Sequence, residues 1–326
     1  MTLPWREEVF EVDKFPLEAG GEISPMRLSY SIIGDPVSHT KQIVLLLPSA
    51  SGLKRWGFGH VGVEATFNPS QSVVVSVDAI GGGLSSRPSE RYALDFPQYC
   101  IRDNARAIHL LLTRGLGVSS IWVAAGPSMG AMIALELGIL FPNFVANLIL
   151  YSPSARCSGI FRVLANAIAK IAMLPNGGLH AAGLAYFPLL VTHDYLERLS
   201  PDQVAEVAEI VAKSWVSEWQ PVDLISRYAC VATHDVSPLG RDLGGTLRSL
   251  TSSTLLMPST SDILLPPSSV QLMDDTIPDS MVVPIQSELG HWAASQPPGS
   301  AEFVQIRDAT RQFLMGRPLG DREISR

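Results

Sequence analysis

One serine has the sequence context of a reactive nucleophile. Residues 126–130 read G-P-S-M-G, which is the pattern G-x-S-x-G with Ser128 at its centre. An apolar run of strand type precedes it, and a segment rich in alanine, leucine and methionine, typical of helices, follows it. Such a strand-turn-helix lifts the hydroxyl clear of the sheet at the positive end of the helix. Glycines flank the serine because side chains there would collide with the strand or the helix.

The pentapeptide alone does not identify a catalytic serine, because G-x-S-x-G also occurs by chance in chains rich in glycine and serine. Its position between a strand and a helix is what favours catalysis. The apolar stretch 121–141 is also about long enough to cross a bilayer. Since Pro127, Ser128 and Glu136 interrupt that stretch, we expect a buried strand and helix instead.

A serine hydroxyl needs a base to remove its proton, and the base needs a carboxylate to orient it. In doubly wound hydrolases the chain order is nucleophile, acid, histidine. Asp262 follows an expected strand at 253–257, and His291 follows an expected strand at 281–285. These positions predict a triad of Ser128, Asp262 and His291.

Other acids and bases have weaker positions. Asp78 also follows a strand, but it precedes the serine in the chain. The remaining histidines fall in expected helices or away from strand ends: His39, His60, His109, His180, His193 and His234.

An oxyanion hole requires backbone N–H donors aimed at the tetrahedral intermediate. Met129 is expected to supply one, and the loop 48–52 the other, through Ala50 or else Ser51. No metal site is expected, because no H-x-x-E-H or clustered ligand pattern is present. No cofactor is expected either.

Several large side chains are candidates to line a substrate pocket, although tryptophans more often serve only in packing. They are Arg55, Trp56, Trp215, Trp219 and Trp292.

The elements that position these groups alternate between strands and helices. Strands at 10–15 and 26–33 predict an opening hairpin around Gly20 and Gly21, and the runs at 41–47 and 72–77 are typical of strands buried on both faces. The alternation predicts a mostly parallel, doubly wound sheet. Amphipathic runs at 160–174, 201–215 and 222–231 predict a helical cap.

The expected organisation is therefore a first part of the core at 1–153, a cap at 154–250 and a second part of the core at 251–326, closed by a helix at 301–315 and a loose tail from 316. The chain has 326 residues, of which 46% are hydrophobic, which is ample for a large core.

The net charge of −7 argues against a nucleic-acid partner. Three widely spaced cysteines fit a reducing compartment, and the first residues lack the apolar core of a signal peptide. We expect a cytoplasmic protein with no membrane partner.

Longer stretches around these residues resemble the homoserine O-acetyltransferase family of α/β-hydrolases. They are residues 96–107 (F-P-Q-Y-C-I-R-D-N-A-R-A), 126–136 (G-P-S-M-G-A-M-I-A-L-E), 223–228 (D-L-I-S-R-Y), 234–236 (H-D-V), 261–267 (S-D-I-L-L-P-P) and 289–291 (L-G-H). The resemblance implies an α/β-hydrolase core with a helical cap, a Ser-Asp-His triad, an acyl-serine intermediate and often a homodimer formed through the cap.

Two departures from the family pattern bear on the reaction. Its acyltransferases usually carry G-G-S-M-G-G, where this chain has Pro127 and Ala131, and an aspartate directly after the catalytic histidine, where this chain has Trp292. An indole cannot pair with the ammonium of an amino-acid acceptor. We therefore expect a serine hydrolase that cleaves a small or medium ester, or else an amide, of a small-molecule acyl substrate.

Three alternatives remain open. They are an acyl-CoA-dependent O-acyltransferase of the homoserine O-acetyltransferase type, a carbon–carbon bond hydrolase that uses the same triad, and a non-catalytic ligand-binding protein of the same fold. The identity of the substrate does not follow from the sequence.

Overall fold

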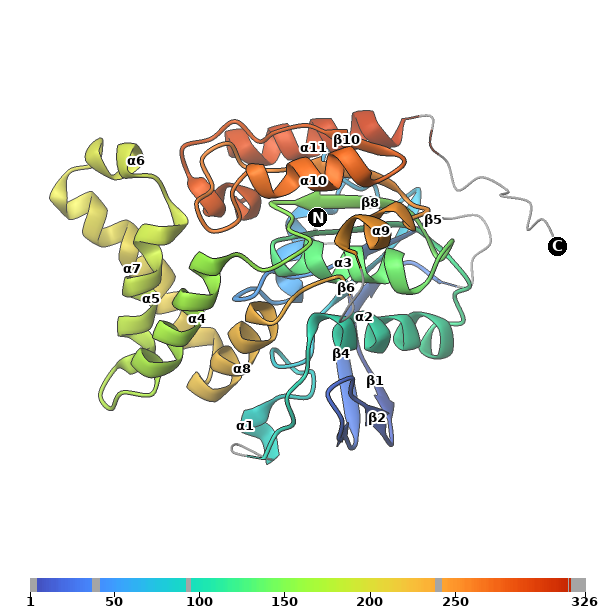
Figure 1. Ribbon diagram of the computed structural model, residues 1–326, viewed down its shortest axis with the longest axis horizontal. Helices are drawn as coiled ribbons and strands as arrows, with labels where there is room; N and C mark the ends of the chain where they lie inside the picture. Colours follow the sequence, from blue (N-terminus) through green and yellow to red (C-terminus); the bar gives the residue numbers. More distant parts are fainter. Residues whose placement is uncertain (1–4, 37–41, 92–94, 238–241, 316, 318–326) are drawn as a thin grey trace.

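An eight-stranded sheet forms the centre of the protein, in the order β1-β4-β6-β5-β7-β8-β9-β10. The structure is a computed structural model that describes residues 5–36, 42–91, 95–237, 242–315 and 317 (Figure 1). The first two strands pair antiparallel at one edge, β4 pairs antiparallel with β6, and the remaining neighbours are parallel. The bounds are β1 Arg6–Val12, β4 Met26–Ile33, β5 Gln42–Leu46, β6 Ser72–Val77, β7 Ile121–Pro127, β8 Val145–Tyr151, β9 Ser253–Met257 and β10 Ser280–Val282.

The predicted opening hairpin is confirmed, but its first strand begins at Arg6 rather than at residue 10. The first part of this edge strand is solvent-exposed and polar, so its sequence lacks the apolar pattern of a buried strand. Two short strands, β2 (Phe15–Pro16) and β3 (Glu22–Ile23), form a separate small sheet in the connection.

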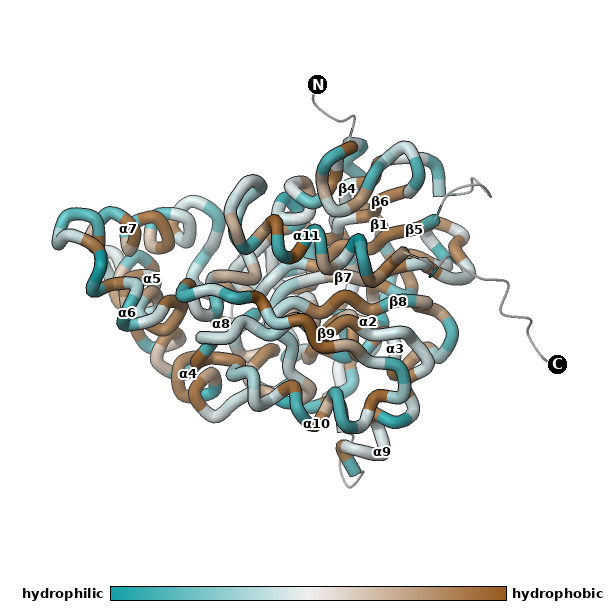
Figure 2. Tube along the Cα trace, turned by 90° about the horizontal axis from the view of Figure 1, so that it is seen from above, coloured by the Kyte–Doolittle hydropathy of each residue, from teal (hydrophilic) through white to brown (hydrophobic). Residues whose placement is uncertain are grey.

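Helices cover both faces of the sheet, which confirms the predicted doubly wound architecture. On β5, Leu45 packs in one apolar cluster and Val44 and Leu46 in the other, as expected for a strand buried on both faces. The first cluster includes side chains of α2 (Ile101–Leu110), α3 (Met129–Leu140) and α10 (Ser268–Thr276). The second includes side chains of α11 (Ala301–Leu314), which lies across the sheet from α2 and α3 (Figure 2).

Five helices between β8 and β9 project to one side of the sheet as a cap (Figure 1). They are α4 Gly159–Ala172, α5 Gly178–Leu190, α6 His193–Glu197, α7 Pro201–Glu218 and α8 Pro221–Ala232. No amphipathic pattern in the sequence predicts α5, because this helix is apolar on most sides and contains Pro188. It packs between α4 and α7, so it needs no polar face. The following α9 (Leu243–Arg248) contacts α10 and belongs to the layer against the sheet.

The stretch 121–141 forms β7 and α3, both buried, as expected. Within the described residues, no helix combines the length and apolar character that crossing a membrane requires. The expected strand start at residue 41 and the expected loose tail from residue 316 lie outside the described residues, apart from Arg317.

Candidate active site

Ser128 lies on a strained turn between β7 and α3. Its φ of 53° and ψ of −112° are a backbone conformation that residues other than glycine rarely adopt. A Cβ on Gly126 or Gly130 would lie 2.5 or 2.4 Å from the carbonyl oxygen of Leu47. Both glycines are therefore required because the end of β5 passes directly against the turn. The Ser128 N–H donates to the Tyr151 carbonyl (2.9 Å), which ties the turn to β8.

The structure brings the three predicted side chains together from separate strand ends. The Nε2 atom of His291 lies 3.0 Å from Ser128 Oγ, and its Nδ1 atom lies 2.6 Å from Asp262 Oδ2. All three residues are buried. With the aspartate on one ring nitrogen, the imidazole presents the other nitrogen to the serine as a proton acceptor.

The Asp262 carboxylate is held by backbone groups of its own loop. Its Oδ1 atom accepts hydrogen bonds from the N–H groups of Leu264 (2.8 Å) and Leu265 (2.9 Å), which leaves Oδ2 directed at the imidazole. The preceding Ser261 donates its hydroxyl to the Ser287 carbonyl (2.6 Å) and accepts from the Gly290 N–H (3.1 Å). This serine therefore connects the acid loop to the histidine loop.

The histidine loop is also attached to the cap. The N–H and hydroxyl of Thr192 both donate to the carbonyl of Glu288, at 3.3 and 2.7 Å. Gly290 has a φ of +52°, and a Cβ there would lie 2.5 Å from the Leu190 carbonyl oxygen at the end of α5. The loop that carries His291 is therefore attached to the cap, at Thr192 and at the end of α5.

A pocket of about 120 Å³ opens over Ser128 and His291. Of the expected oxyanion-hole residues, Ala50 and Ser51 line this pocket, and Met129 is the buried first residue of α3. Trp215 and Trp292 also line it, as proposed from the sequence. The full lining is Ser49, Ala50, Ser51, Ser128, Tyr186, Leu190, Val211, Ser214, Trp215, His291, Trp292 and Ser295.

Three of the five candidate lining residues do not line this pocket. Trp219 packs against Arg227, whose Cζ atom lies 5.1 Å from the centroid of the indole ring. Its indole N–H donates to the Ser51 carbonyl (3.1 Å). Trp56 packs against His60, in the apolar cluster on the face of the sheet that α11 covers. Arg55 is exposed to solvent. Both lie in the short 3₁₀-helix Lys54–His60, which follows the loop 48–52.

Tyr186 and Leu190 also line the pocket, from α5, and were not among the residues predicted from the sequence. Because that helix had no amphipathic signal, nothing in the sequence placed these side chains over the serine.

The rival histidines have structural positions. His60 and His234 are buried, and burial lowers their pKa values to about 3 and about 4. The ring of His109 stacks on Phe141 with centroids 3.6 Å apart. His180 and His193 lie beside glutamates in the cap, and His39 is outside the described residues.

The rival acid Asp78 is buried and turned toward Lys54. Its Oδ1 atom accepts from the Lys54 N–H (2.8 Å), and its Oδ2 atom lies 3.7 Å from the Lys54 ammonium. Burial raises the pKa of this carboxyl group, and the hydrogen bond and charge of Lys54 oppose that rise.

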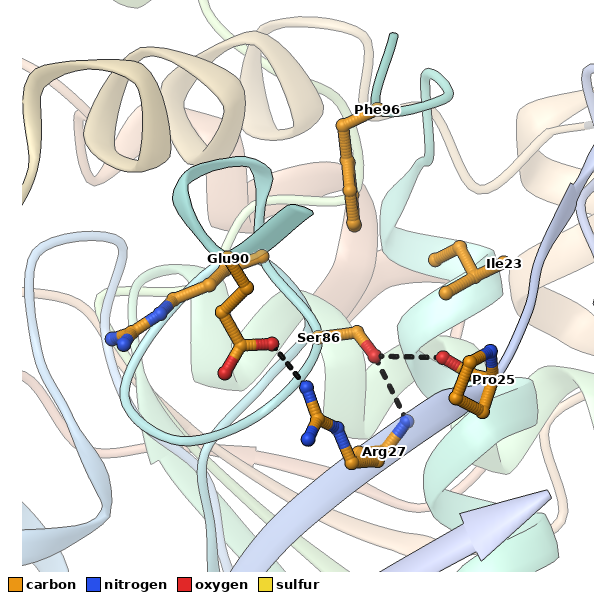
Figure 3. Close-up of a pocket in the computed structure, with 7 residues that line it drawn as sticks. Ile23, Pro25, Arg27, Ser86, Glu90 and Phe96 are labelled. Atoms are coloured by element: carbon orange, nitrogen blue, oxygen red, sulfur yellow. Dashed lines mark hydrogen bonds and ion pairs between the residues drawn. The ribbon is translucent and has the colours of Figure 1, made fainter. Parts of the chain in front are cut away.

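A pocket of about 20 Å³ near Arg27 has room for little more than a water molecule (Figure 3). Figure 3 shows Arg27 paired with Glu90 and its backbone N–H bonded to the Ser86 hydroxyl. Because the pocket is this small and the Arg27 guanidinium is already paired with Glu90, we assign it no chemistry. Among the described residues, no group of three or more histidine, cysteine, aspartate or glutamate side chains is placed to hold a metal ion.

Comparison with known proteins identifies the fold and the family resemblance. A family model described as the alpha/beta hydrolase fold matches residues 66–296. The homoserine O-acetyltransferase of Chlorobaculum parvum is 27% identical over 314 residues, covering 86% of this chain and 87% of that protein. The resemblance inferred from the motifs is thereby confirmed.

Two solved structures illustrate the range of neighbours. An acetylester hydrolase from Corynebacterium glutamicum superposes with a TM-score of 0.86 at 20% identity, covering 95% of this chain and 96% of that one. The homoserine O-acetyltransferase of Bacillus anthracis superposes with a TM-score of 0.82 at 19% identity, covering 96% and 98%. The same fold thus occurs in proteins of both names.

Proposed function

The chain belongs to the α/β-hydrolase fold family, and we propose that it is a serine hydrolase that cleaves a small or medium carboxylic ester. The observation that carries this proposal is the pair of contacts that join Ser128 Oγ to His291 and His291 to Asp262, at 3.0 and 2.6 Å. Strained backbone at the serine and a pocket above it support the same assignment.

In the first half-reaction, His291 Nε2 accepts the proton of Ser128 Oγ while that oxygen attacks the ester carbonyl carbon. The charge on the resulting oxyanion is stabilised by the N–H groups of Met129 and of Ala50, with Ser51 as the alternative donor. The C–O bond to the alcohol then breaks, and the alcohol leaves with the proton from His291. Asp262 stabilises the imidazolium through both proton transfers.

In the second half-reaction, His291 removes a proton from water, which attacks the acyl-serine carbonyl. As the second tetrahedral intermediate collapses, its C–O bond to Ser128 Oγ breaks, the His291 imidazolium donates its proton to Ser128 Oγ, and the carboxylic acid is released. Ser128 and His291 are then ready for another substrate molecule.

The pocket supports a small acyl group. Its volume of about 120 Å³ accommodates a few non-hydrogen atoms, and the rings of Tyr186, Trp215 and Trp292 line it. We expect acetyl and propionyl esters to be cleaved with a higher kcat/KM than octanoyl esters.

Acyl transfer to an alcohol acceptor is the second candidate, because relatives named homoserine O-acetyltransferase match most of the chain. Trp292 argues against an amino-acid acceptor, since it lines the pocket with an uncharged ring. The two candidates differ in what they require: hydrolysis needs only ester and water, whereas transfer needs acyl-CoA together with a hydroxylated acceptor.

The deciding experiment measures hydrolysis of p-nitrophenyl acetate by the wild type and by Ser128→Ala, with intact-mass detection of the acyl-enzyme. We expect a mass increase of one acetyl group in the wild type and a loss of activity of about 10⁴-fold or more in the variant. Unchanged activity in Ser128→Ala would refute the assignment. Product that forms only with acetyl-CoA and an acceptor would favour acyl transfer.

We also propose that the cap forms a homodimer. Its helices expose apolar side chains to solvent, among them Val163 on α4 and Val216 on α7. Burial of such side chains against a second copy would be favourable. Val163→Asp should shift the mass in light scattering toward a monomer, whereas Val9→Asp, at an exposed valine on edge strand β1, should not.

A cytoplasmic location is proposed on the cysteines: Cys100, Cys157 and Cys230 are all free thiols in the structure. Cell fractionation with a periplasmic marker tests this location.

A further inference from the structure

Residues 49–54, which we call the oxyanion loop, are bound to the cap by a hydrogen bond from Trp219. Trp219, just past the end of α7, is buried and donates its indole N–H to the carbonyl of Ser51 at 3.1 Å. Ser51 directly follows Ala50, the expected oxyanion donor. A turn closed by the Gly52 N–H on the Ser49 carbonyl (3.2 Å) contains both residues. A displacement of Ser51 would therefore move the Ala50 N–H.

The core holds the other end of the same loop. Asp78, directly after β6, accepts the Lys54 N–H at 2.8 Å, and the Ser76 hydroxyl donates to the Lys54 carbonyl at 2.6 Å. The Lys54 ammonium is buried, 2.6 Å from Glu7 and 3.7 Å from Asp78. The Ser29 hydroxyl completes its surroundings. The loop therefore leaves the site through a backbone peptide bound to a buried carboxylate.

The two anchors pack against one another through the loop that follows β6. A Cβ on Gly82 would lie 2.2 Å from Arg227 Nη2 and 2.7 Å from the Trp219 ring. A Cβ on Gly83 would lie 2.2 Å from the Asp78 carboxylate. The Arg227 guanidinium donates to the Ala79 carbonyl at 3.0 Å and lies over the Trp219 ring. The loop that follows β6 therefore packs closely against both anchors.

We propose that Trp219 and Asp78 are positioning residues that set the distance from the Ala50 N–H to the substrate carbonyl oxygen. Neither residue lines the pocket over Ser128, so each acts through the loop rather than on the substrate. The inference rests on the proposed function, because an oxyanion hole has a purpose only if Ser128 forms a tetrahedral intermediate.

Displacement of the Ala50 N–H should raise the free energy of the transition state more than that of the bound substrate. An oxyanion donor contributes mainly once negative charge develops on the carbonyl oxygen, and its complete removal costs about 10² to 10³-fold in kcat. A donor that is displaced but still present should cost less, about ten-fold. Ground-state binding depends on the pocket walls, which neither residue forms, so KM should stay within about two-fold.

Trp219→Phe is the principal test, because it removes the indole N–H and keeps an aromatic ring beneath Arg227. The matched control is Trp122→Phe, since Trp122 on β7 donates its indole N–H to the Arg317 carbonyl, away from the pocket. The measurements are kcat and KM for p-nitrophenyl acetate, the Ki of 1,1,1-trifluorobutan-2-one and the melting temperature. The bound trifluoroketone carries its hemiketal oxygen in the oxyanion hole and so reports on the donors directly.

We expect Trp219→Phe to lower kcat about ten-fold and to raise the Ki of the trifluoroketone by the same factor, with KM within about two-fold. Trp122→Phe should match the wild type in all three constants. A purely structural role would lower the melting temperature and leave kcat and Ki within about two-fold of the wild type, and that result would overturn the proposal. An increase in KM with kcat unchanged would overturn it as well.

Asp78→Asn tests the anchor on the core side and should change kcat and Ki in the same direction. If that variant does not fold, Trp219→Phe decides alone. Ser128→Ala separates the two levels of inference. An inactive Ser128→Ala with a fully active Trp219→Phe overturns the positioning role only, whereas an active Ser128→Ala overturns the proposed function and the positioning role together.

Discussion

Asp78 and Asp262 both lie beyond the carboxyl ends of parallel strands, in two regions of the sheet, but they have different partners. Each is a buried carboxylate directly after a parallel strand or in its following loop, and each accepts hydrogen bonds from backbone N–H groups. The second oxygen of Asp262 lies 2.6 Å from the imidazole of His291, whereas that of Asp78 lies 3.7 Å from the ammonium of Lys54.

The difference shows that the partner of the carboxylate, and not its burial or its place at a strand end, separates the candidate catalytic acid from an anchoring one. An imidazole gains a proton during the reaction and needs a nearby negative charge at that moment. The Lys54 ammonium keeps its charge throughout, so Asp78 stabilises a fixed arrangement.

The largest expected effect is the loss of activity when Asp262 is replaced, compared with the same replacement at Asp78. Asp262→Asn should lower kcat about 10⁴-fold, because the amide favours the wrong imidazole tautomer and cannot stabilise the imidazolium. Asp78→Asn should lower kcat only about ten-fold. Steady-state kinetics with p-nitrophenyl acetate measure both. Losses of equal size would show that the two carboxylates do not differ in role as their partners indicate.

The next largest effect concerns the turn that carries Ser128. Gly130→Ala would place a Cβ 2.4 Å from the Leu47 carbonyl oxygen, so the strand end that leads into the oxyanion loop must move. We expect about a 10²-fold loss of kcat, because small displacements of reacting groups carry costs of that order.

Gly159→Ala is the matched control for this substitution, since nothing lies within 4 Å of a Cβ at Gly159 and its backbone conformation suits alanine. Its kcat should equal that of the wild type. A Gly130→Ala enzyme of normal activity would show that the turn can adjust without moving the serine.

A smaller effect concerns the connection between the acid and histidine loops. Ser261→Ala removes the hydroxyl that donates to Ser287 and accepts from Gly290. The free energy of unfolding should fall by about 1–2 kcal/mol, as expected for the loss of two partly buried hydrogen bonds, and kcat should fall a few-fold. Urea unfolding and kinetics on the same preparation measure both, and Ser217→Ala, on the exposed surface of α7, is the control.

The last effect concerns the pH dependence of stability, not kcat, and involves the buried histidines that have no catalytic assignment. Burial lowers the pKa of His234 to about 4, against about 6.5 in an unfolded chain. Below pH 6.5 the unfolded state binds a proton that the folded state does not, so the free energy of unfolding falls as the pH falls from about 6.5 to about 4. The slope is at most about 1.4 kcal/mol per pH unit for each such histidine, and His60 adds a similar contribution.

Urea unfolding of the wild type and of His234→Gln between pH 7 and pH 4.5 tests this contribution. The stability advantage of the wild type over His234→Gln should shrink as the pH falls. His193→Gln, at an exposed position on α6, should show no such trend. An advantage of His234 that stays constant over this range would mean that its pKa is not lowered by folding.

The sequence determined the parts of this protein that depend on local pattern and chain order. G-x-S-x-G between a strand and a helix was enough to locate Ser128, and the order of strand-end residues was enough to select Asp262 and His291, because the carboxyl ends of parallel strands share one edge. The doubly wound sheet was also predictable from the sequence, because strand-type apolar runs alternate with helical runs along the chain.

Tertiary structure decided which side chains surround that serine. Trp215 lines the pocket while Trp219, four residues later, holds the oxyanion loop from behind, and no local pattern distinguishes the two. Their roles depend on how the cap packs against loops that lie far away in the chain, since Trp219 and Ser51 are 168 residues apart. Contacts across such separations arise only when the whole core has formed.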